Sequence, residues 1–197
     1  MKLHYKGKFN LDPESLPSRP HQDGAVRFRE AKDSKEMMII ASVISVLLFI
    51  VCDAILYLRC GNAVFYDLLV GGILALLCAF PHELLHAVCF NEDVYLYTNL
   101  KQGMLFVIGP ETMSKRRFIF MSILPNLIFG ILPFLIALIW PSLGILGTFG
   151  VVSISMGAGD FYNIFNAMTQ MPRGARTYLH QFNSFWYMPA TKNGRGA

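Results

Sequence analysis

Charged side chains are scarce in this sequence. Asp, Glu, Lys and Arg make up 15% of its 197 residues, whereas hydrophobic residues make up 54%. Soluble globular domains usually carry about 25% charged residues. The scarcity of charge therefore argues against a soluble domain and indicates that a lipid bilayer surrounds much of the chain.

Cysteine is also rare. The four cysteines follow no paired spacing that is typical of metal ligands. Most of them lie in or beside apolar stretches, so we interpret them as small buried apolar residues.

Four apolar stretches are long enough to cross about 30 Å of hydrocarbon as helices. They lie near Met37–Leu58, Leu68–Phe90, Phe118–Trp140 and Leu143–Met171. The first follows 36 mostly polar residues and fits a secretory signal peptide poorly. We expect an all-α polytopic membrane protein with four transmembrane helices in residues 37–171, an N-terminal arm in residues 1–36 and a tail in residues 172–197.

The distribution of Lys and Arg predicts the orientation in the membrane. Eight lie in residues 1–36, four in residues 91–117 and four after Met171, whereas the two remaining connections hold only Arg59. We therefore expect a multi-pass protein of the cell membrane with both termini in the cytoplasm. Because orientation accounts for these basic residues, nucleic acid is not an expected partner.

Short strand-like segments occur outside the apolar stretches. In Ala25–Glu30 apolar and charged residues alternate, as in a half-exposed strand. The runs Val94–Tyr97 and Met104–Ile108 predict a small cytoplasmic β-hairpin in residues 91–117. The proline-containing first half of the N-terminal arm is expected to lack a packed core of its own.

The second apolar stretch contains the motif His82-Glu83-Leu84-Leu85-His86. In an α-helix the two histidines share one face, about 6 Å apart along the axis, so both can bind one zinc ion. Zinc can lower the pKa of a water molecule to about 7 and polarise a carbonyl, while a nearby carboxylate such as Glu83 takes the proton. Ionisable groups are costly in an apolar helix, which favours a functional metal site over a chance pattern.

A catalytic zinc site needs a third protein ligand. Asp160 ranks first, because the second and fourth spans run in the same direction and bring it to about the depth of His82. Asp53 and Asp67 are excluded as the third ligand, because both lie far from His82 in membrane depth. Three residues that follow the motif in the sequence remain possible ligands: Cys89, Glu92 and Asp93.

Two asparagines are candidates for supporting roles. Asn163 lies one turn after Asp160, where it could hold that carboxylate, bind substrate or join two helices. Asn126, which follows Pro125 in the third span, poses the same alternatives. The segment Gly157-Ala158-Gly159 lets another backbone approach closely just before Asp160.

The chain resembles the small bacterial membrane proteins described as putative zincin peptidases, relatives of the site-2 intramembrane metalloproteases. The resemblance rests on three segments: Ala25–Glu30, Phe80–Ala87 and Gly159–Asn163. It implies that His82, His86 and Asp160 hold one zinc ion and that Glu83 is the catalytic acid and base.

These observations favour a zinc endopeptidase that cleaves a membrane-protein substrate at a site open to the cytoplasm. The edge of the predicted hairpin could capture the substrate as an added strand. The alternative is a non-enzymatic metal-binding membrane protein that acts as a scaffold, a sensor or an immunity factor. The presence of Glu83 favours the enzyme, because two histidines and an aspartate suffice for a structural metal site.

The orientation is testable with reporter fusions. We expect fusions after Lys35, within residues 91–117 and after Met171 to report a cytoplasmic position, because sixteen of the seventeen Lys and Arg residues lie in these regions. An externally accessible tag after Met171 would contradict the four-span topology and the depth argument for Asp160.

Overall fold

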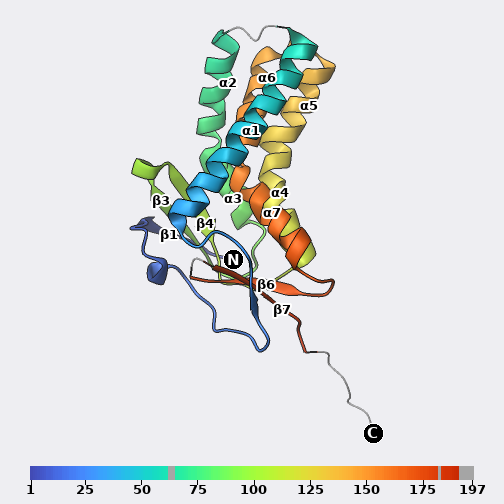
Figure 1. Cartoon of the computed structure of the whole chain (residues 1–197). Helices are drawn as coiled ribbons and strands as arrows, with labels where there is room; N and C mark the ends of the chain where they lie inside the picture. The colour runs from blue at the N-terminus through green and yellow to red at the C-terminus, as the bar shows by residue number, and fades with distance from the viewer. Residues whose placement is uncertain (62–64, 182, 191–197) are drawn as a thin grey trace.

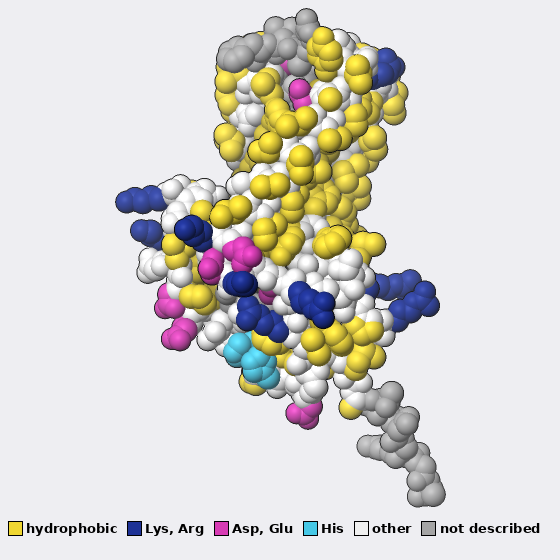
Figure 2. Space-filling model, viewed as in Figure 1, with side chains coloured by type: hydrophobic (Ala, Val, Ile, Leu, Met, Phe, Trp, Pro, Cys, Tyr) yellow, Lys and Arg dark blue, Asp and Glu magenta, His cyan; other side chains and the backbone are white. Residues whose placement is uncertain are grey.

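The computed structural model describes residues 1–61, 65–181 and 183–190. A column of helices forms one end of the molecule, and two β-sheets form the other end (Figure 1). The N-terminus lies at the sheet end, as does the last described part of the chain. Hydrophobic side chains cover the column, whereas most charged side chains in view gather around the sheets (Figure 2).

Helices and strands alternate in blocks along the chain. The helices are α1 Ser34–Cys60, α2 Phe65–Leu77, α3 Ala79–Ala87, α4 Lys115–Pro125, α5 Leu132–Ile139, α6 Gly144–Met156 and α7 Ala158–Gln170. A π-helical turn, η3 Asn126–Ile131, joins α4 to α5, and short 3-10 turns lie at Pro13–Ser15 (η1) and Leu100–Gln102 (η2). The strands are β1 Leu3–Lys8, β2 Val26–Arg27, β3 Val94–Asn99, β4 Met104–Ile108, β5 Met113–Ser114, β6 Arg176–His180 and β7 Asn183–Tyr187.

Among the described residues, three helical stretches are long and apolar enough to cross a membrane. They are Ser34–Cys60, Tyr66–Ala87 and Lys115–Ile139. A fourth apolar stretch consists of α6 and α7, which meet at an angle of 54°. The break follows Met156, where Gly157 precedes α7.

Helix α6 is the centre of the column, and small residues let its neighbours approach closely. A β carbon at Gly71 of α2 would lie 2.6 Å from the backbone nitrogen of Phe149 in α6. A β carbon at Gly150 of α6 would lie 2.6 Å from the backbone nitrogen of Phe134 in α5. Glycine at these positions therefore permits backbone-to-backbone packing without a steric clash.

The predicted hairpin is present and belongs to a larger sheet. Strands β3 and β4 pair antiparallel, and β1 of the N-terminal arm adds to β3 in parallel. Phe9 and Leu16, which follow β1, are buried against Tyr97. This part of the arm therefore packs in a core that it shares with the hairpin. Strand β3, the partner of β1, lies about 90 residues later in the sequence, so the residues of β1 alone do not predict this pairing.

A second sheet has the strand order β2-β7-β6-β5. It unites the end of the N-terminal arm, the segment before α4 and the C-terminal tail. The prediction of an all-α protein with one small hairpin is therefore wrong, since the described residues form two sheets. The tail has the aromatic residues that favour strands, Tyr178, Phe185, Trp186 and Tyr187, but their pairing depends on tertiary contacts.

Glu30 fastens the N-terminal arm to this second sheet. Its Oε1 accepts a hydrogen bond of 2.6 Å from the backbone N–H of Ser184. Nearby, Phe28 is buried against Ala167 and Met171. Burial of the Glu30 carboxyl group raises its pKa from 4.5 to about 7 and outweighs the opposing effects of Ser184 and Arg27.

The raised pKa predicts a pH-dependent attachment of the arm. The protonated carboxyl is favoured in the folded state, so its stabilising contribution is complete below pH 4.5 and is lost as the pH rises through about 7. We expect the fluorescence of Trp186, measured in a Trp140→Phe background, to change with a midpoint near this pKa. Glu30→Gln should remove the transition, and a transition that persists in this variant would contradict the assignment.

Candidate metal centre

Helix α3 presents the predicted residues of the motif on one side. The ring centroids of His82 and His86 lie 5.0 Å apart, with an angle of 75° between the ring planes. One nitrogen of each ring and one carboxylate oxygen of Glu83 all lie within 4.8 Å of one another. The side chains of His82 and His86 are only 16% and 10% exposed. A single helix therefore brings three potential metal donors to one largely buried point.

Helix α7 brings Asp160 to the same point. Asp160 Oδ2 lies 3.1 Å from His82 Nε2, and Asp160 Oδ1 lies 3.2 Å from His86 Nε2. The residue occupies the first turn of α7, directly after the break at Gly157. The structure thus brings together the four residues of the predicted zinc site, and the carboxylate of Asp160 bridges the two imidazoles.

The carbonyl of Met121 in α4 orients His86. His86 Nδ1 lies 2.9 Å from this carbonyl oxygen. Because a carbonyl can only accept, Nδ1 carries the ring hydrogen and Nε2 of the neutral ring keeps its lone pair. Pro125, one turn later, has no N–H to donate to Met121. The proline therefore leaves free the acceptor that turns His86 Nε2 toward Asp160.

The contact between His86 and Asp160 fits a bound cation. With Nδ1 protonated, the neutral ring presents Nε2 as an acceptor, and Asp160 Oδ1 at 3.2 Å is an acceptor too. Two acceptors at this distance need a proton or a cation between them. In a tetrahedral zinc site with bonds of about 2.0 Å, neighbouring ligand atoms lie about 3.3 Å apart. The observed spacings of 3.1 and 3.2 Å are close to this value, and imidazole and carboxylate are ligands that zinc prefers.

Asn126 supports the Asp160 carboxylate. It is 1% exposed, and its Nδ2 donates a hydrogen bond of 2.7 Å to Asp160 Oδ2. A β carbon at position 157 would overlap the Asn126 amide, so Gly157 makes room for this contact. Asn163 instead lines an adjoining cavity of about 290 Å³ together with the motif residues. Of the two predicted asparagines, Asn126 is the one whose side chain donates a hydrogen bond to Asp160.

Glu83 is oriented by the edge of a strand. Its Oε2 accepts a hydrogen bond of 2.8 Å from the backbone N–H of Val107 in β4. Leu105 and Val107 line the same cavity as Glu83. The sequence predicted the hairpin and the motif separately, but a contact between a strand backbone and a helix leaves no periodic signal. For that reason the role of Val107 was missed.

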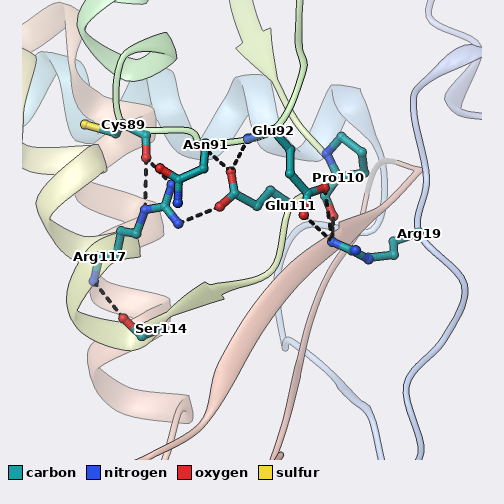
Figure 3. Close-up of polar contacts among 8 residues, drawn as sticks. All are labelled: Arg19, Cys89, Asn91, Glu92, Pro110, Glu111, Ser114 and Arg117. Carbon is teal, nitrogen blue, oxygen red and sulfur yellow. Dashed lines mark hydrogen bonds and ion pairs between the residues drawn. The ribbon is translucent and has the colours of Figure 1, made fainter. Parts of the chain in front are cut away.

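The other candidate ligands lie elsewhere. Cys89 Sγ donates to the carbonyl of Leu85 at 3.4 Å. Glu92 forms an ion pair with Arg19 (Figure 3), with 3.4 Å between the charged atoms, and Asp93 lies 3.0 Å from His4. None of the three lines the cavity beside the motif, and neither do Asp53 and Asp67.

An ion pair holds the chain just after α3. The guanidinium of Arg117 donates two hydrogen bonds to the carbonyl of Cys89 and lies 2.5 Å from Glu111 Oε1 (Figure 3). Glu111 Oε2 accepts from the backbone N–H groups of Asn91 and Glu92. Burial alone would raise the pKa of Glu111, but these interactions outweigh it and lower the pKa. These contacts of Arg117 and Glu111, which we call the clamp, connect the end of α3 to the start of α4. The two helices carry His86 and Met121.

Comparison with known proteins gives one family. The model of a family described as putative zincin peptidase matches residues 74–176. The match includes the motif on α3, the strands β3 and β4, and Asp160 on α7. No curated protein matches the chain, and no solved structure does.

The third ligand can be tested by measuring zinc in the purified protein. We expect Asp160→Ala to lower zinc occupancy as strongly as His86→Ala, because each removes one ligand from a three-ligand site. Asp53→Ala removes an acidic group from α1 and serves as the matched control, with zinc retained. Full zinc content in Asp160→Ala, with loss of zinc in Cys89→Ala, would overturn the ligand assignment.

Proposed function

Because the chain belongs to the putative zincin peptidase family, we propose that it is a zinc-dependent endopeptidase that cleaves membrane proteins within or beside the bilayer. The match covers just over half of the chain and supports a metallopeptidase in general terms. The membrane-protein substrate and the cytoplasm-facing site are inferred from the geometry and from the distribution of charge.

The proposed ligands are His82, His86 and Asp160, which converge from α3 and α7. When bound, zinc would act as a Lewis acid that polarises the scissile carbonyl and makes a water molecule easier to deprotonate. Asn126 and the Met121 carbonyl hold Asp160 and His86 in orientation. Such outer contacts typically change metal affinity by about 10- to 100-fold when they are removed.

Glu83 is the proposed general base and acid. The Val107 N–H holds one carboxylate oxygen, Oε2, and this contact leaves Oε1 for proton transfer. Glu83 takes a proton from water as the water oxygen bonds to the carbonyl carbon. It then gives the proton to the amide nitrogen as the carbon–nitrogen bond breaks. The net reaction is hydrolysis of one peptide bond, with Glu83 returned to its starting state.

Strand β4 is the proposed binding edge for the substrate. It is the last strand in the order β1-β3-β4. The N–H of Val107 points away from β3, and in an antiparallel ladder the backbone groups of Leu105, two residues away, point the same way. An extended peptide could therefore pair with β4 and lie across the cavity beside Glu83.

The proposed site opens toward the cytoplasm. His82 lies near the end of the apolar stretch Tyr66–Ala87, on the side where the chain continues to the sheets. The sheet end contains the arm, the hairpin loop and the tail, in which the basic residues gather. Substrate bonds within or next to a transmembrane segment would meet the site at this depth.

One observation carries the proposal, namely the position of Glu83 beside two histidines that already have Asp160 as a partner. A scaffold or sensor that used the metal only for structure would need the three ligands but not this fourth group. The hydrogen bond from Val107 orients Glu83 without making it a required ligand.

Glu83→Gln separates the enzyme from a scaffold. It keeps the size of the side chain but cannot accept a proton, so zinc should remain while cleavage falls by about 10²- to 10⁴-fold. His82→Ala should lose both zinc and cleavage. Each variant would be co-expressed with tagged single-span membrane proteins, fragment release followed by immunoblot, and zinc measured in the same preparations.

Two outcomes would contradict the mechanism. Equal fragment release by the wild type and Glu83→Gln would indicate a contaminating protease. A zinc-loaded wild type that cleaves none of the tested proteins, with Glu83→Gln reproducing its cellular phenotype, would favour the scaffold.

A further inference from the structure

A groove of about 550 Å³ lies between α2 and α6. One side is lined by Asp67 and Leu74, which lie seven residues apart on one face of α2, and by Cys78, which directly follows α2. Its α6 side is apolar and includes Ile145 and Phe149. The proposed peptidase reaction uses none of these residues directly.

The groove shares one lining residue with a cavity beside the candidate metal centre. Cys78, at one end, also lines a smaller cavity of about 150 Å³ that contains His82 and Glu83. This second cavity shares both residues, together with Leu105 of β4, with the cavity beside Asp160. The three cavities are therefore related by shared lining residues, Cys78 between the first two and Leu105 of β4 between the last two.

The far end of the groove is acidic. The Asp67 carboxylate lies directly over the α carbon of Gly144, where a β carbon would overlap it. Thr148 donates to the backbone carbonyl of Asp67 and not to its side chain. Among the described residues, no Lys or Arg forms an ion pair with Asp67. A carboxylate at the rim of an apolar groove favours an occupant that brings a positive charge.

We propose that this groove binds the transmembrane helix of the substrate, with a Lys or Arg of that helix opposite Asp67. The inference rests on the proposed peptidase function and adds a rule for the choice of substrate. Asp67 and His82 are fifteen residues apart, which is about 22 Å along a helix. The bond to be cleaved should therefore lie about fifteen residues from the basic residue, toward the cytoplasm.

The charge and the course of the groove favour a peptide over a lipid. The common zwitterionic phospholipid headgroups pair an ammonium group with a phosphate and have no net charge, whereas a Lys or Arg side chain brings a full positive charge to Asp67. A peptide in this groove would also lie next to the cavity that Glu83 lines, because Cys78 belongs to both. A helix satisfies its own backbone hydrogen bonds in the apolar part of the path.

The test uses a synthetic probe and needs no catalysis. Full-length Glu83→Gln protein would be placed in phosphatidylcholine nanodiscs with a Leu/Ala transmembrane peptide that carries one terminal Lys and a photoreactive residue at its centre. We expect crosslinks to map to α2 and α6. Asp67→Asn, and a probe with Gln in place of Lys, should each weaken binding about fivefold, the effect of one partly exposed ion pair.

Charge reversal provides the sharper comparison. Asp67→Lys should prefer a probe with Glu over the probe with Lys, whereas the matched variant Asp53→Asn on α1 should bind like the parent protein. Zinc content, measured on every variant, checks that the metal centre is intact. Equal binding of the Lys, Gln and Glu probes to the parent protein would overturn the inference, as would groove labelling by a photoreactive phospholipid that the peptide does not displace.

The outcomes distinguish this inference from the proposed function. Cleavage that depends on Glu83, together with probe crosslinks outside the groove, would refute the groove and leave the peptidase intact. Charge-selective crosslinks in the groove, together with no cleavage by the wild type, would support the groove as a helix-binding surface and refute the peptidase.

Discussion

The bridge that Asp160 forms between His82 and His86 is the interaction on which the rest of the structure depends. Ionisable groups in an apolar helical column are costly unless each is compensated. Here one cation can compensate all three groups, because the carboxylate presents one oxygen to each imidazole. Asn126 adds a hydrogen bond to the same carboxylate. A metal ion would strengthen this arrangement, since all of the donors already point to one place.

Interruptions in the helices make the bridge possible. The break at Gly157 starts a new helix in whose first turn Asp160 lies, and it leaves space for the amide of Asn126. Pro125 frees the Met121 carbonyl that orients His86, and the π-helical turn follows directly. Each irregularity would destabilise a simple membrane helix. At this site each one supplies a specific contact.

The sequence predicted the parts of the site that depend on spacing or depth. Helical periodicity put His82 and His86 on one face, and membrane depth put Asp160 beside them. It did not predict the Val107 contact to Glu83 or the clamp from Arg117 to Cys89, because these join segments that are distant in sequence. The same limit explains the missed sheets. β1 lies about 90 residues from β3, and β2 pairs with β7 about 160 residues later.

The proposed path of the substrate, from the groove between α2 and α6 to the edge of β4, fits the hydrogen-bonding needs of a peptide backbone. In the bilayer a peptide must remain helical, because lipid offers no partners for its N–H and C=O groups. A peptidase needs an extended peptide, whose backbone groups then require new partners. The unpaired edge of β4 can supply such partners next to Glu83. The transition from helix to strand is therefore least costly where the apolar column meets the sheet, and that junction is where His82, His86 and Asp160 converge.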